Sequence, residues 1–138
     1  MAVETRSAID DAAIQAFASS MRGVLIRPTD PAYDTARTVY NAMIDRKPVL
    51  IARCADAGDV MQAIKFARGH GLLLAVRGGG HSGPGLGVCD DGLVIDLSLM
   101  KGVRVDPVAR TARVSGGSLL GEVDHATHAF GLATPSGI

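Results

Sequence analysis

The spacing of apolar residues along the chain alternates between the period of a helix and that of a strand. Residues 8–20 carry alanine, isoleucine and phenylalanine at helical spacing, which predicts a first helix. Residues 23–28 form a short apolar run closed by a proline, as is typical of a strand. Asp30 as the cap and Pro31 at the first position predict a second helix that runs to about Met43.

The next segment has the pattern of a strand, a helix and another strand. A buried strand is predicted at 48–54 and a second one at 72–76, each a short apolar run bounded by turn residues. Between them, Asp56 or Asp59 is the candidate N-cap of a helix that ends in the sequence GHG. This order predicts a βαβ unit whose two strands are parallel.

After a glycine-rich loop, the sequence GLVIDLS predicts a further strand, and 103–114 predicts a hairpin that turns at Asp-Pro. Residues 118–130 predict a last helix capped by Ser118. The mixture predicts the α+β class. We divide the chain into an N-terminal helical segment, 1–22, and one domain, 23–138.

Composition and charge exclude several classes of protein. Of 138 residues, 14 are basic and 14 acidic, so the chain has no electrostatic footprint for nucleic acid or an anionic membrane. Two cysteines, Cys54 and Cys89, make neither a disulfide framework nor a zinc knuckle. No apolar stretch is long enough to span a bilayer. The first residues lack the pattern of a secretory signal, so we expect a cytoplasmic protein.

Glycine is unusually frequent, and 15 of the 17 glycines lie in residues 69–137. Three of them occur in RGGGHS, 77–82, directly after a predicted strand. Successive glycines let several backbone N–H groups converge on a ligand, which suits a pyrophosphate, and Arg77 could supply a compensating charge. A flexible surface hairpin would need the same glycines, so the pattern by itself leaves both interpretations open.

The common phosphate-binding motifs fit this loop poorly. A Walker-type loop requires GK followed by serine or threonine, and that sequence is absent from the chain. A dinucleotide fingerprint requires its glycines to open a helix. Here the loop continues through Pro84 and Gly85 into a predicted strand, so it belongs to neither class.

A more specific resemblance lies in the strings around this loop. AVRGGGHSGPGLGVCDDGLVIDLS resembles the first flavin loop of the p-cresol methylhydroxylase-type FAD-binding domain, of the vanillyl-alcohol oxidase superfamily. DPVARTARVSGGSLLGEVDHATHAFGLATPSGI is similar to the hairpin, helix and second flavin loop that follow in it. The resemblance begins near residue 23 and favours the berberine-bridge-enzyme-like branch. It implies a small βαβ-containing subdomain and the start of a second α+β subdomain, hence an N-terminal fragment truncated at its C-terminal end.

The resemblance implies FAD as the cofactor, held covalently through His81. The loop backbone from Arg77 to Ser82 would bind the pyrophosphate, and the imidazole would bond to the flavin 8α-methyl group. From the residues alone, a solvated loop histidine is the alternative. The implied cofactor-binding residues are Arg77, Gly78, Gly79, Gly80, His81, Ser82, Gly116, Gly117, Thr134, Pro135, Ser136 and Gly137.

Two parts of this set leave alternatives open. Gly116 and Gly117 fit close approach to the cofactor and fit a plain turn equally well. The stretch from Thr134 to Gly137 resembles the start of the second flavin loop, where doubly linked members use a cysteine. No cysteine occurs in 130–138. The matching position can lie just beyond the last residue, so a second covalent link to the flavin stays open. Cys89 does not match that cysteine and is interpreted as a small buried filler.

No metal ligand and no catalytic residue is predicted. His125 and His128 lie one turn apart on a helix without supporting ligands, which is typical of an exposed helix face. His70 suits the C-terminal end of its helix. The catalytic base of the family comes from a region beyond this chain, and Tyr33 and Tyr40 match no such position.

By resemblance, the parent protein is an FAD-linked oxidase. A substrate carbon beside an alcohol or amine would deliver hydride to the flavin, and oxygen would accept the electrons. The substrate would be a small molecule bound by a downstream domain, so we expect the fragment alone to be inactive. A sugar, an amine and a hydroxy acid are all compatible, and the oligomeric state is open. The alternative is a stand-alone or remnant flavin-binding module without catalysis.

Overall fold

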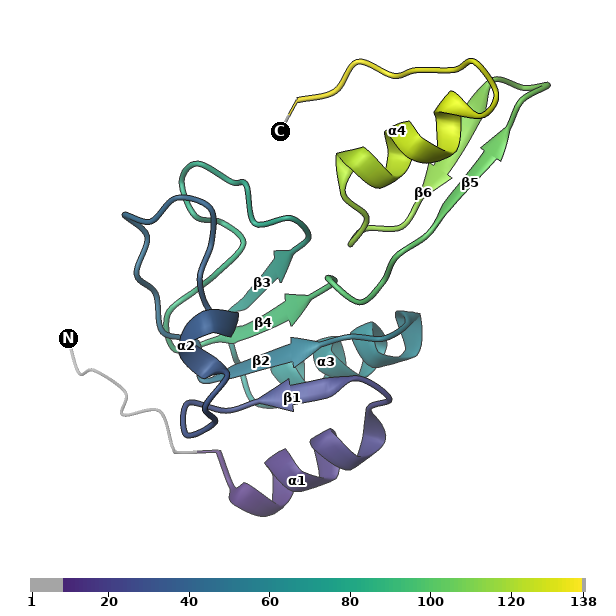
Figure 1. The fold of residues 1–138 in the computed structure, drawn as a ribbon. Helices are drawn as coiled ribbons and strands as arrows, with labels where there is room; N and C mark the ends of the chain where they lie inside the picture. Colours follow the sequence, from purple (N-terminus) through teal and green to yellow (C-terminus); the bar gives the residue numbers. More distant parts are fainter. Residues whose placement is uncertain (1–8, 138) are drawn as a thin grey trace.

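The computed structural model describes residues 9–137, in which a four-stranded sheet forms the centre of the larger lobe (Figure 1). Its strands are β1 (Val24–Ile26), β2 (Leu50–Arg53), β3 (Leu74–Arg77) and β4 (Leu93–Asp96). The order is β1-β2-β4-β3, with β2 and β3 both parallel to β4 and β1 antiparallel to β2. The strands of the predicted βαβ unit are therefore parallel, as expected, although β4 lies between them.

Helices cover both faces of this sheet. One face is covered by α1 (Asp11–Ser20) and α3 (Ala57–Gly69), and the other carries the short α2 (Tyr33–Ala36). A second lobe follows in the chain and consists of the hairpin β5 (Val103–Asp106) and β6 (Thr111–Val114) with α4 (Leu120–His128) (Figure 1). The mixed α+β class is thus confirmed. None of the helices in residues 9–137 has the length and apolar character needed to cross a membrane.

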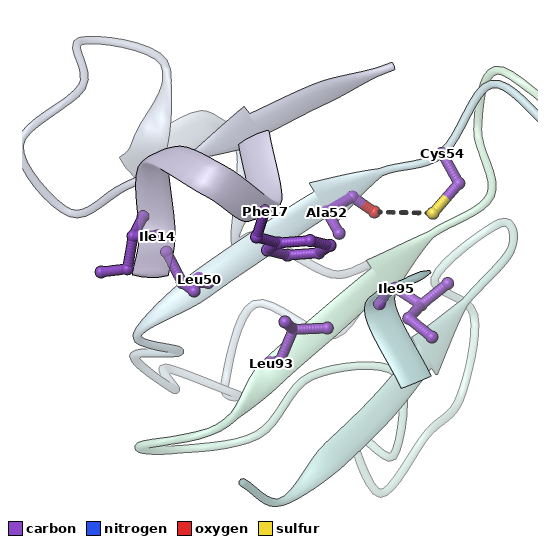
Figure 2. Close-up of a cluster of buried hydrophobic side chains, with 8 residues drawn as sticks. Ile14, Phe17, Leu50, Ala52, Cys54, Leu93 and Ile95 are labelled. Carbon is purple, nitrogen blue, oxygen red and sulfur yellow. Dashed lines mark hydrogen bonds between the residues drawn. The ribbon is translucent and has the colours of Figure 1, made fainter. Parts of the chain in front are cut away.

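The two central strands send alternate side chains to opposite faces. Toward α1 and α3, Leu50 and Leu93 pack against Ile14 and Phe17 (Figure 2). The Phe17 ring stacks on Phe66 of α3, with 4.4 Å between the ring centroids. Burial on both sides explains why these strands are uninterrupted apolar runs in the sequence.

The opposite face is covered by α2 and by the loop of residues 78–92, which connects β3 to β4. Val88 and Cys89 of that loop are buried against Ile51 and Val94 of the sheet. The interpretation of Cys89 as a buried filler is therefore confirmed. The loop that carries the glycine sequence is thus also part of the hydrophobic core.

The predicted helix from Asp30 to Met43 is wrong in extent, because α2 ends after four residues at Ala36. Two β-branched residues follow shortly, which favour extended backbone over helix. The N–H of Tyr40 donates to the carbonyl of Gly80, 3.0 Å away, instead of a carbonyl within the helix. A tertiary hydrogen bond has replaced the helical one, and the segment after α2 lies against the glycine loop.

Three expected caps differ from the structure, because Asp30, Asp59 and Ser118 do not cap their helices; the N-cap of α2 is Ala32. Asp56 caps α3 by accepting the N–H of Asp59. Asp59 is buried inside the first turn and accepts N–H groups of Arg22, Gly23 and Ala55 at 2.8–2.9 Å. Ser118 does not cap α4, because its hydroxyl pairs with the backbone of Gly102 on the hairpin.

Candidate cofactor site

Three charged side chains lie in register where the parallel strands end. Arg53 closes β2, Asp96 closes β4 and Arg77 closes β3, and each arginine is the register partner of Asp96. Both guanidinium groups donate to the same oxygen, Oδ2 of Asp96, at 3.0 Å from Arg53 Nε and 2.9 Å from Arg77 Nη2. The carboxyl ends of parallel strands are where open α/β sheets bind ligands, so this buried triad lies at the base of a candidate site.

The triad keeps Asp96 ionised although its side chain is only 1% exposed. Burial alone would raise the pKa of this carboxyl, but the Ser98 N–H and the two arginines together hold the pKa below its ordinary value. Arg77 also donates from Nη1 to the carbonyl of Thr38, 3.0 Å away. Its guanidinium is therefore committed within the protein, and the structure does not present it as a free charge for a pyrophosphate.

The glycine loop begins directly after Arg77. Gly80 adopts a φ of +73°, which a side chain would strain. Gly78 lies against the backbone of Gly116, so close that a Cβ at Gly78 would stand 2.6 Å from the carbonyl oxygen. Within residues 9–137, no protein acceptor is found for the five consecutive N–H groups from Gly78 to Ser82. Such a row of free N–H groups is a nest suited to an anion.

His81 is exposed at the far end of the three glycines. Its ring lies beside that of Tyr40, with 4.9 Å between centroids and 31° between the planes. A Cβ at Gly79 would stand 3.0 Å from the Nδ1 atom, so the imidazole also lies close to the loop backbone. The histidine is thus accessible and still has neighbours on the protein.

A groove of about 1020 Å³ opens along this loop. Residues 77–82 form one wall, and the beginning of α4 contributes Leu119 and Leu120. Ser136 and Gly137, from the last described residues, lie on the same groove. The structure therefore brings together most of the residues that the sequence predicted. Val76 and Leu86 add apolar surface, so the groove combines a polar strip of backbone with apolar walls.

The remaining predicted residues do not line the groove. Gly117 is buried at the other end of the turn, where a Cβ would stand 1.7 Å from the carbonyl oxygen of Leu97. Its glycine is required by contact with the protein's own backbone, which favours the turn interpretation. Gly116 approaches Gly78 from the second lobe. Thr134 and Pro135 are exposed on the segment that leads to Ser136.

Sequence reasoning missed two contributors to this site. Asp96 was read only as part of a strand, although an acidic residue in an otherwise apolar strand signals a buried partner. Tyr40 was placed on a predicted helix that in the structure ends at Ala36. A second hollow of about 450 Å³, on the Tyr40 side of the loop, is lined by Arg53, Asp96 and residues 78–81. The glycine loop thus forms a wall between two hollows.

The residues set aside in the sequence have ordinary surroundings. His125 and His128 lie on the exposed face of α4. His70 caps the end of α3, where its ring nitrogen contacts the carbonyl of Phe66 at 2.9 Å. In the part of the chain that the structure describes, no cluster of three or more histidine, cysteine or acidic side chains is placed to hold a metal ion.

Comparison with known proteins identifies the family. Residues 48–137 match the FAD binding domain family, and the chain belongs to it. The chain is 36% identical to (R)-6-hydroxynicotine oxidase of Paenarthrobacter nicotinovorans over 119 residues, which cover 86% of the chain and 26% of that protein. It is 36% identical to berberine bridge enzyme-like 9 of Arabidopsis thaliana over 86 residues, covering 61% of the chain and 16% of that protein.

A solved structure shows the same fold. The crystal structure of 6-hydroxy-D-nicotine oxidase from Arthrobacter nicotinovorans superposes with a TM-score of 0.77 at 36% identity, covering 81% of this chain and 25% of that one. The resemblance drawn from the sequence is thereby confirmed: this is an FAD-binding domain of the FAD-linked oxidoreductases, related to the berberine-bridge-like enzymes. The chain spans about a quarter of the length of the relative it matches over most of its own length.

Proposed function

We propose that the 1020 Å³ groove holds FAD, with the pyrophosphate on the N–H groups from Gly78 to Ser82. The observation that carries this proposal is the row of backbone donors without protein acceptors, on a loop whose glycines leave room for close approach. The apolar walls at Leu119 and Leu120 suit the flat ring systems of a dinucleotide. Ser136 and Gly137 complete the groove from the second lobe.

His81 is proposed to carry the flavin covalently. The imidazole is exposed, lines the groove and stands at the end of the nest, so a flavin bound there lies within its reach. The bond would join a ring nitrogen of His81 to the 8α-carbon of the flavin, which would lose one hydrogen while the imidazole would lose another. The two hydrogens would leave as two protons and two electrons, and dioxygen would accept both to become hydrogen peroxide, so atoms and electrons balance.

The bound flavin supplies the redox chemistry, which we propose to be hydride acceptance from a CH–OH or CH–NH substrate with oxygen as the final acceptor. The residues of this chain bind and orient the cofactor. The Arg53–Asp96–Arg77 triad fixes the strand ends from which the loop departs. The substrate, a small molecule, and the catalytic base are assigned to a region outside these 138 residues, so the chain alone should not turn over substrate.

The test is the intact mass of the full-length natural protein after denaturation, with its visible spectrum recorded first. We expect the mass to include a flavin, and His81→Ala to lose that added mass while the native protein still binds FAD. His125→Ala, an exposed histidine on α4, is the matched control and should keep the added mass. Flavin that leaves the denatured wild type would refute the covalent link alone. A folded protein that never holds flavin would refute the FAD site.

A further inference from the structure

Tyr40 has an unusual position for an exposed aromatic residue. Its side chain is 71% exposed, yet its ring meets the imidazole of His81 at a centroid distance of 4.9 Å. Within residues 9–137, no hydrogen bond to the His81 ring is observed, and Tyr40 provides an aromatic ring contact to the imidazole. Burial does not explain a tyrosine at this place.

The backbone that carries Tyr40 is fixed to the glycine loop at three points. Arg77 Nη1 donates to the carbonyl of Thr38 at 3.0 Å, and the N–H of Tyr40 donates to the carbonyl of Gly80 at 3.0 Å. Asn41 Nδ2 donates to the carbonyl of Gly83 at 2.9 Å. These bonds bracket His81 on both sides in the sequence. The backbone of Tyr40 is therefore held at a defined place relative to the loop that carries His81.

A histidine on a glycine-rich loop would otherwise sample several rotamers. Three staggered positions about χ1 and a broad range about χ2 are open to an exposed imidazole. Bond formation at a flavin carbon requires one ring nitrogen at one place, and rate falls when that geometry is only part of the ensemble. An aromatic neighbour at 4.9 Å with tilted planes is a favourable ring contact that selects one of these orientations.

We propose that Tyr40 is a positioning residue that orients the His81 imidazole for attachment to the flavin. The proposal rests on the function proposed above, in which His81 carries the cofactor. The phenol ring acts through its tilted ring contact with the imidazole, and the structure gives its hydroxyl no part in that contact. Tyr40 should thus raise the rate of covalent flavin attachment without changing the affinity for FAD.

The test follows attachment in time. Full-length apoprotein is mixed with FAD, and total bound flavin is measured beside the flavin that survives denaturation. We expect Tyr40→Ala to bind FAD as the wild type does but to form the bond about three- to tenfold more slowly, which matches the usual strength of an aromatic pair. Tyr40→Phe keeps the ring and should attach at the wild-type rate. Met43→Ala, on the same segment and 91% exposed, is the control and should leave the rate unchanged.

Each other outcome overturns the assignment. A wild-type rate in Tyr40→Ala means that the ring does not orient His81. If Tyr40→Phe slows flavin attachment as much as Tyr40→Ala does, the hydroxyl of Tyr40, and not its ring contact with His81, sets the rate of attachment. If Tyr40→Ala lowers the total bound flavin as much as the flavin that survives denaturation, Tyr40 acts in the binding of FAD and not in its attachment. A wild type that holds FAD without a bond removes the role while the FAD site stands, whereas a wild type without any flavin removes the proposed function itself.

Discussion

Arg77 and Asp96, register partners on the adjacent strands β3 and β4, form a buried ion pair with 2.9 Å between Nη2 and Oδ2. The pair ties Arg77, after which the glycine loop begins, to β4, one of the two central strands of the sheet. Arg53 reaches the same oxygen from the other side, and the Ser98 N–H occupies Oδ1. One carboxylate therefore fixes the ends of three strands, and its loss should affect stability before it affects cofactor chemistry.

Replacement of Asp96 should show this dependence. Asp96→Asn leaves two arginines without their partner and should lower the free energy of unfolding by about 3–5 kcal/mol at pH 7. Because the pKa of Asp96 is lowered in the folded state, its carboxylate stabilises the fold fully above the unfolded value of about 3.9. That contribution is lost as the pH falls through the lower, folded pKa, so wild type and variant should converge in acid.

Urea denaturation at a series of pH values measures this difference. Asp34→Asn removes an exposed carboxylate on α2 whose partner Arg37 keeps Asp45, so this control should change the midpoint little. A difference between wild type and Asp96→Asn that stays constant from neutral pH into acid would show that the carboxylate is not the source of the stabilisation.

Valine in the glycine loop should abolish flavin binding. At Gly80 the positive φ of +73° is unfavourable for any side chain and most of all for a β-branched one. At Gly79 the added atoms meet the imidazole of His81. Gly83→Val is the matched control, because nothing lies within 4 Å of a Cβ there. Flavin content of the purified proteins is the measurement, and normal content in Gly80→Val would contradict the nest.

Alanine at Gly117 and alanine at Gly121, both in the second lobe, should change the stability of the protein in opposite directions. Gly117→Ala places a methyl group 1.7 Å from the Leu97 carbonyl oxygen and should disrupt the packing of the turn between β6 and α4 on that residue, seen as a large loss of thermal stability. Gly121→Ala lies on α4 in open space and should stabilise the protein by roughly 0.5–1 kcal/mol, since alanine favours helix. Thermal unfolding of both variants tests this, and equal effects would contradict the packing at Gly117.

Both cysteines should be chemically silent in the folded protein. Burial raises the pKa of the Cys54 thiol to about 12, and nearby Asp59 and Asp96 act in the same direction. Burial also raises the pKa of Cys89. We expect no alkylation of either residue by iodoacetamide at pH 8 in the native state and full alkylation in denaturant. Peptide mass mapping reads out each site, and rapid native labelling at Cys54 would show that the core opens.

The sequence was most informative where local pattern and tertiary structure agree. The strands at Leu50–Arg53 and Leu93–Asp96 and the helix Ala57–Gly69 follow from apolar runs, helical spacing and caps. The loop RGGGHS and its histidine were located by motif, and the family confirmed there is the one it predicted. Local preferences were sufficient for these elements because nothing distant opposes them.

Distant partners decided the features that were missed. The segment after Ala36 leaves the helix because Tyr40 and Asn41 bond to the glycine loop some forty residues later. Ser118 leaves its expected cap for Gly102. The pairing of Arg77 with Asp96 was not predicted because a partner on β4 cannot be recognised without the register of the sheet. Each of these choices is made by a residue that single-sequence patterns do not connect.

The loop between β3 and β4 buries Val88 and Cys89 on one side and offers free N–H groups on the other. A mobile lid usually covers little hydrophobic surface. If this loop left the sheet, it would instead expose the hydrophobic cluster that includes Ile51 and Val94. Entry of a cofactor should therefore leave this loop in place on the sheet. Substitutions at the buried Val88 or Cys89 should consequently impair folding and cofactor retention together, and the two defects should be difficult to separate by selection.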